Sequence, residues 1–148
     1  MNILRDETEI AINGLAVACL EAADIHESAA AACAEPVIER KLKDLAQVRR
    51  QASEALAAFL AERYGGPNWP EQERELLKKA ATRVKSAFSP DATASLLSDC
   101  LAEEERVRDA ASAASHQKVP SAVEARIAEL RQDAEAQIRW LQSCIPVE

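Results

Sequence analysis

Residues 64–70 read YGGPNWP, and this stretch separates two pairs of long alanine-rich runs. Two consecutive glycines end a helix readily, and proline disrupts a helix interior but is tolerated in its first turn. The remaining prolines open a run or lie between runs, at Pro36, Pro90, Pro120 and Pro146. These breakers predict five helices, over residues 6–34, 36–64, 70–88, 90–115 and 121–144.

The composition favours an all-α fold. Of the 148 residues, 31 are alanine, three are glycine and only 3% are aromatic. Alanine is the best helix former, whereas strands are built from β-branched and aromatic residues, whose runs are missing here. A chain of this length can bury a hydrophobic core without disulfides or a structural metal, so we expect one domain over residues 1–148.

Each long predicted helix carries an apolar or small residue at every third or fourth position, which is the spacing of a buried helix face. In the first two helices the stripes are Ile12, Leu15, Cys19, Ala22, His26, Ala29, Cys33, and Ile38, Leu42, Leu45, Val48, Ala52, Ala55, Phe59. In the last two they are Leu97, Cys100, Glu104, Val107, Ala111, Ala114, and Val123, Ile127, Leu130, Ala134, Ile138, Leu141. Two tightly joined helices, a connection containing a shorter helix, and two further helices predict a four-helix bundle with one crossover, as in ferritin-like folds.

The charge and the cysteines restrict the classes of partner. A net charge of −7 disfavours nucleic acid and acidic membrane surfaces, because both require clustered Lys and Arg. The longest uncharged stretch, Ile10–Leu20, is far shorter than the ~20 residues of a membrane span. The acidic N-terminal region does not resemble an export signal, and the four cysteines form no CxxC pair. We therefore predict a cytoplasmic protein with reduced thiols, no membrane contact and no nucleic-acid partner.

The residues that carry a family resemblance lie mainly in the first two predicted helices, with Trp69 and residues 97–104 further along the chain. They are Asn13-Gly14-Leu15, Cys19, Glu21-Ala22, His26, Ala29-Ala30, Leu45-Ala46-Gln47, Arg49, Gln51 and Tyr64-Gly65-Gly66. In these positions the sequence resembles bacterial ferritin-like four-helix-bundle proteins of unknown function, a group linked with stress responses. The resemblance implies a ferritin-like bundle with an extra crossover helix.

A ferritin-like fold raises the question of a di-iron or di-manganese site. Such a site takes one Glu from each of two helices and a Glu-x-x-His pair from each of the other two. The residue three positions before His26 is Ala23, and the one before His116 is Ala113, so the chain contains no Glu-x-x-His. We therefore predict no di-metal site and no cofactor.

Three residues of the predicted core remain candidates for a single metal site: His26, Cys100 and Glu104. Imidazole, thiolate and carboxylate are all good zinc ligands. Alternatively, His26 donates to a backbone or carboxylate partner, and Glu104 pairs with Arg49 or Arg50, because a buried carboxylate must be neutralised or hydrogen-bonded. We favour the second interpretation.

The sequence leaves three hypotheses for function. The first is a non-catalytic bundle that self-associates or binds a protein partner, in a bacterial stress response if the resemblance extends to function. The second is a bundle that binds a metal or small ligand through His26 and Glu104. The third is a degenerate ferritin-like oxidase. We favour the first because it requires no residue that the sequence lacks, and we assign no catalytic residue, since no serine has a His and an acid in a recognisable arrangement.

Overall fold

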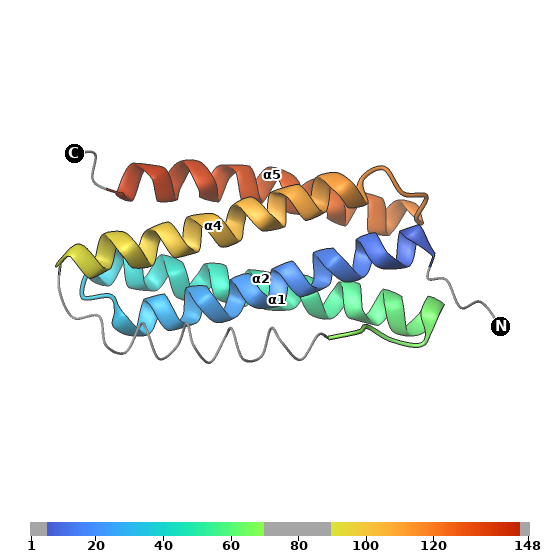
Figure 1. Ribbon diagram of the computed structural model, residues 1–148, viewed down its shortest axis with the longest axis horizontal. Coiled ribbons are helices and arrows are strands. Elements are labelled where there is room, and N and C mark those ends of the chain that lie inside the picture. The colour runs from blue at the N-terminus through green and yellow to red at the C-terminus, as the bar shows by residue number, and fades with distance from the viewer. Residues whose placement is uncertain (1–5, 70–89, 146–148) are drawn as a thin grey trace.

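A computed structural model describes residues 6–69 and 90–145, with the side chains of residues 90–92 left out. These described residues form four helices and no strand: α1 (Glu7–Ala32), α2 (Pro36–Tyr64), α4 (Pro90–Ala114) and α5 (Ser121–Cys144) (Figure 1). The prediction of an all-α helical bundle is confirmed. The predicted helix over residues 70–88 lies outside the described residues.

The helices pack as two antiparallel pairs. α1 packs along α2 and α4 packs along α5, while α1 and α4 make the main contact between the pairs. Within each pair the connection is short: residues 33–35 join α1 to α2, and residues 115–120 join α4 to α5. Figure 1 shows that α2 and α4 run in the same direction, so α2 ends at one end of the bundle and α4 begins at the other.

The helix ends follow the breakers in most cases. Pro36 is the first residue of α2, and the preceding Glu35 accepts hydrogen bonds from two backbone N–H groups of the first turn. Gly65 ends α2 with a φ of +89°, a left-handed conformation that glycine adopts without the steric cost of a Cβ. From the sequence, Ser121 could cap α5 together with Glu124, but this prediction is wrong: Ser121 is the first helical residue, and Pro120 occupies the cap position without a side-chain hydrogen bond. α1 ends at Ala32, two residues earlier than predicted.

Most residues of the predicted stripes are buried, but Val48 is exposed, and five others are only partly buried: Cys33, Ile38, Ala55, Phe59 and Val123. Val48 was expected to face inward, but 47% of its surface is exposed and the neighbouring Arg49 is buried. After Leu45 a helical stripe can continue at the third or the fourth residue, and the structure takes the fourth and then Ala52. This shift by one position brings a guanidinium into the core.

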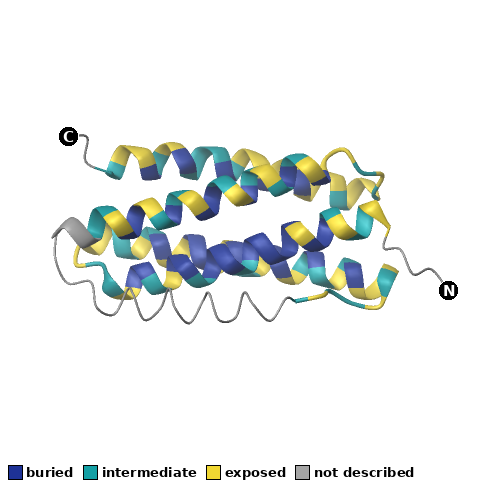
Figure 2. Cartoon of the chain, in the orientation of Figure 1, coloured by how far each residue is buried: buried dark blue, intermediate teal, exposed yellow. Residues whose placement is uncertain are grey.

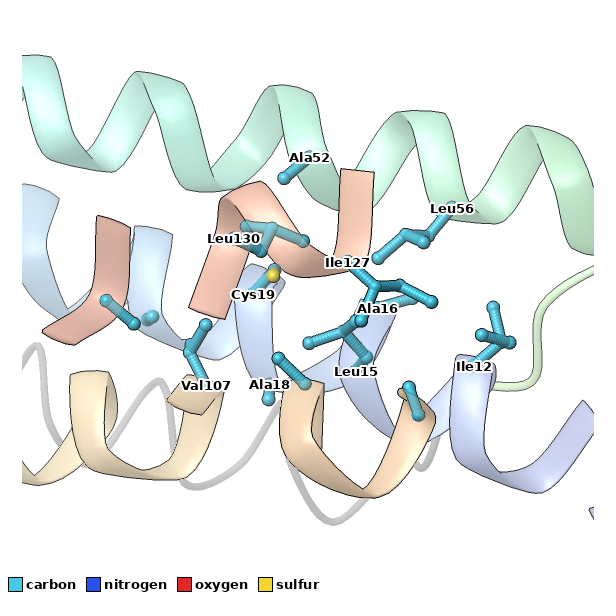
Figure 3. Close-up of a cluster of buried hydrophobic side chains, with 14 of the residues drawn as sticks. Ile12, Leu15, Ala16, Ala18, Cys19, Ala52, Leu56, Val107, Ile127 and Leu130 are labelled. Atoms are coloured by element: carbon cyan, nitrogen blue, oxygen red, sulfur yellow. The ribbon is translucent and has the colours of Figure 1, made fainter. Parts of the chain in front are cut away.

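Alanines let α1 approach its neighbours closely. Figure 2 shows α1 buried along much of its length, and its buried residues lie on more than one face of the helix. Around Cys19, a hydrophobic cluster brings together side chains from all four helices, among them Leu15 of α1, Leu56 of α2, Val107 of α4 and Leu130 of α5 (Figure 3). A second cluster includes Leu42, Leu97 and Leu141. Trp69 packs against the first cluster and Trp140 against the second, and both are partly buried.

A pair of asparagines attaches the segment after α2 to α1. Asn13 donates from its side chain to the backbone oxygen of Asn68 at 3.0 Å, and the Asn68 backbone N–H donates back to the Asn13 amide oxygen at 2.8 Å. In the described part of the chain, no helix is apolar over a long enough run to cross a membrane.

Candidate functional site

One side chain from each helix meets in a polar cluster inside the bundle. The cluster consists of His26 of α1, Arg49 of α2, Glu104 of α4 and Asp133 of α5. The first three side chains are fully buried, and Asp133 is 37% exposed. Burying such groups is tolerated only when they are paired and hydrogen-bonded, so the partners of each atom decide what the site can do.

Glu104 lies at the centre of the polar cluster. Arg49 donates to it in a two-point contact, from Nε to Oε2 at 3.0 Å and from Nη2 to Oε1 at 2.6 Å. Nε2 of His26 lies 2.9 Å from the same Oε2. Both carboxylate oxygens therefore have a partner: Oε1 accepts from Arg49 of α2, and Oε2 contacts both Arg49 and His26 of α1.

The pKa of Glu104 is lowered even though the side chain is buried. Burial alone would raise it, but hydrogen bonds from His26 and Arg49 and the positive charge of Arg49 outweigh that effect. An ionised carboxylate only accepts hydrogen bonds, so Nε2 of His26 carries the proton and donates. Nδ1 of His26 then faces no hydrogen-bond partner among the described residues.

Arg49 connects the buried carboxylate to the surface. Its Nη2 also lies 2.8 Å from Oδ2 of Asp133, whose other oxygen accepts a hydrogen bond from Gln137 at 3.2 Å. Burial opposes the charge on Arg49, but Glu104 and Asp133 outweigh it and raise the pKa of the guanidinium. Within residues 6–69 and 90–145, Nη1 of Arg49 has no hydrogen-bond partner.

The predicted pairing of His26 with a carboxylate and of Glu104 with Arg49 is confirmed. Arg50, the other proposed partner of Glu104, instead contacts Asp24 at 2.6 Å and Glu27 at 2.9 Å near the surface. Asp133 was not predicted as a site residue. Its sequence signal is its place beside Ala134 of the α5 stripe, which puts it at the edge of the buried face.

The candidate metal ligands His26, Cys100 and Glu104 are all fully buried. Burial raises the pKa of the Cys100 thiol, which disfavours the thiolate that would bind a metal. Burial likewise raises the pKa of Cys19 to about 12. Among the residues that the structure describes, no three His, Cys, Asp or Glu side chains form a group that could hold a metal ion. A metal role for these three residues stays a prediction.

A second acidic site lies where α1 meets α4. Glu21 and Glu103 are both nearly buried and share Arg106, whose Nη1 lies 3.1 Å from Glu21 and 3.5 Å from Glu103. Burial raises the pKa of Glu103 to about 7, Arg106 counteracts this, and the negative charge of Glu21 adds to it. Glu103 is therefore only partly ionised near neutral pH.

An open groove of about 990 Å³ lies between α2 and α5. These two helices are not among the extensively packed pairs of the described structure. Arg49, Leu45 and Leu130 contribute to its floor, and the exposed Val37 and Val48 line its α2 side. The polar cluster thus ends at this groove, because Asp133 lines it as well.

The comparisons with known proteins give no assignment: no protein-family model, no curated protein and no solved structure matches the chain.

Proposed function

We propose that this protein is a non-catalytic, ferritin-like bundle that acts by binding another protein chain through the groove between α2 and α5. The parallel course of α2 and α4 supports the ferritin-like arrangement, because it requires one long connection between the two pairs. The proposal places the protein in the bacterial cytoplasm, and the link with stress responses follows from the family resemblance.

The observation that carries the proposal is the position of the exposed apolar side chains. The described residues expose three large hydrophobic side chains, Ile10, Val37 and Val48, and two of them line one groove. Apolar side chains gathered in a groove that is bordered by charged residues are typical of a surface that binds a helix.

The chemistry of the interior also favours binding over catalysis. Glu104 is ionised and its oxygens are occupied by Arg49 and His26, so it is not free to act as a base. The buried thiols of Cys19 and Cys100 have raised pKa values, which makes them poor nucleophiles.

The test compares a charge placed in the groove with the same charge elsewhere. Val48→Glu puts a carboxylate in the groove, and Ile10→Glu is the matched control on α1. Sedimentation velocity from micromolar to millimolar protein measures self-association, and affinity capture followed by mass spectrometry measures other partners. We expect Val48→Glu to lose an association that the wild type and Ile10→Glu retain. A wild-type monomer whose captured proteins are unchanged by Val48→Glu would rule out the proposal.

A second candidate function is the binding of a metal or small ligand in the bundle interior. It is supported by two buried nitrogens that lack a hydrogen-bond partner in the described structure, Nδ1 of His26 and Nη1 of Arg49. Elemental analysis of protein purified without chelators tests it. Near-stoichiometric zinc, iron or manganese that disappears in His26→Gln would support this function, and metal-free wild-type protein would remove the metal version of it.

A further inference from the structure

A short stripe on the exposed side of α2 has a palindromic order. Val37, Lys41, Asp44 and Val48 are separated by four, three and four residues. At about 100° per residue they lie within about 60° of one another around the helix axis. All four line the groove between α2 and α5, so they form one continuous strip along its α2 side, which we call the α2 strip.

The order of the α2 strip is complementary to itself in the antiparallel direction. The midpoint between Val37 and Val48 is also the midpoint between Lys41 and Asp44. A two-fold axis through that midpoint brings Val37 of one copy opposite Val48 of the other. The same register brings Lys41 opposite Asp44. Apolar residues meet apolar residues and opposite charges meet, all in a single alignment.

We propose that the partner in the groove is a second copy of this chain, with the two α2 strips packed antiparallel across a two-fold axis. This inference rests on the proposed function and specifies its partner. In a two-fold interface each contact occurs twice, so the axis generates two valine contacts and two Lys41–Asp44 pairs from one strip.

The distribution of charge favours a second copy over a different partner. The chain carries a net charge of −7, so two copies repel one another overall, and a contact between them requires a patch that is not acidic. The α2 strip itself is neutral, with one lysine and one aspartate. A partner helix of uniform charge would attract one of these residues and repel the other, whereas the reversed strip satisfies both.

One side chain of the proposed contact, Lys41, is already restrained. The Lys41 ammonium lies 4.2 Å from the centre of the Trp140 ring of α5, a cation–π contact that limits its motion. Asp44 is 67% exposed, and its contact with Arg40 is long, at 3.9 Å. Its carboxylate is therefore accessible to a second copy. Restraint before binding lowers the entropy lost on association.

Charge reversal and charge exchange test the register directly. Lys41→Asp or Asp44→Lys would each create two like-charge pairs in the dimer, and the double variant would restore two opposite-charge pairs in reversed order. Sedimentation equilibrium should show a dimer for the wild type, a dissociation constant at least about tenfold higher for each single variant, and recovery in the double variant. Glu54→Lys, with the same charge change as Asp44→Lys on an exposed position of α2 away from the strip, should leave the dimer unchanged.

The outcomes separate this inference from the proposed function. If the wild type is a monomer at millimolar concentration, the partner in the groove is not a second copy of this chain. Loss of a captured protein in Val48→Glu would in that case still support the proposed function of the groove. A wild-type dimer that is insensitive to both single reversals overturns the α2 strip as its interface. Far-UV circular dichroism of every variant checks that the helices are intact, so that a lost dimer is not the result of unfolding.

Discussion

Glu104→Gln is the substitution that most directly tests the role of the polar cluster. It keeps the size of the side chain and removes only its negative charge, so no cavity is created. Of the two carboxylates that the described structure places beside Arg49, Asp133 would then remain. His26 would lose an ionised acceptor 2.9 Å from its Nε2.

The expected loss of stability follows from the burial of both charges. Removing one partner of a buried ion pair typically costs about 3–5 kcal/mol, because the remaining charge is left uncompensated. The partly exposed Asp133 still neutralises part of the Arg49 charge, so we expect about 3 kcal/mol. For a chain of this size that corresponds to a fall in Tm of roughly 6–12 °C.

Urea unfolding followed by circular dichroism measures this loss, with an unchanged m value as the sign that the folded state stays compact. Glu39→Gln is the matched control, because Glu39 pairs with Lys43 at 2.8 Å at the surface, where Lys43 is exposed and Glu39 is partly exposed. We expect a loss of no more than about 0.5 kcal/mol there. The double variant Arg49→Met/Glu104→Met should be more stable than Arg49→Met or Glu104→Met alone, because it leaves neither Arg49 nor Glu104 as a buried charge without its partner.

The pH dependence supplies an independent check. The pKa of Glu104 is lowered in the folded state, so its contribution is present above the pKa of an unfolded glutamate and disappears as the pH falls below it. The difference in stability between wild type and Glu104→Gln should therefore shrink as the pH falls from about 6 to about 3. Equal losses in Glu104→Gln and Glu39→Gln, or a difference independent of pH, would refute the assigned role of the cluster.

Three further predictions concern single residues. Glu103→Gln should stabilise the protein at pH 8 by on the order of 1–2 kcal/mol and have little effect at about pH 4, measured by urea unfolding. The pKa of Glu103 is raised to about 7 in the folded state, so stability is lost as the pH rises from the ordinary glutamate pKa of about 4.3 to about 7. Gly14→Ala should raise the Tm and Gly65→Ala should lower it, each by the equivalent of about 1 kcal/mol, since a Cβ at Gly14 has open space within a helix whereas Gly65 has a φ of +89°. Ser53→Ala should cost about 1 kcal/mol in chemical denaturation, because its buried hydroxyl donates to the Ala16 carbonyl at 2.8 Å; no loss would mean that this bond is not stabilising.

The sequence was sufficient to predict the four described helices because their boundaries depend on local chemistry. Pro36 and Gly65 act through their own backbone preferences, and both mark the ends of α2 in the structure. Ser121 shows the limit of such reasoning. A residue with a good capping side chain was available, yet the helix begins at Ser121 itself. Pro120 has an extended backbone with a ψ of 150°, and its carbonyl accepts the first helical hydrogen bonds, from Val123 and Glu124.

The site was only partly predictable, because its partners come from four helices. The pairing of Glu104 with Arg49 could be anticipated, since a buried acid needs a cation. The inward position of Arg49 itself could not, because Val48 is apolar and fits the same stripe as well. The choice between them depends on the rotation of α2 about its axis, which the facing helices determine.

The polar cluster has a consequence for the alignment of the helices along the bundle axis. Stripes rich in alanine offer nearly the same small, smooth surface at each turn, so apolar packing alone discriminates weakly between neighbouring alignments. A slip of one helix by a single turn would move its polar residue by about 5.4 Å, well beyond hydrogen-bonding distance. Because His26, Arg49, Glu104 and Asp133 each come from a different helix, any such slip leaves at least one polar group of the cluster without its partner. The cluster therefore selects one alignment among several that the apolar surfaces would accept.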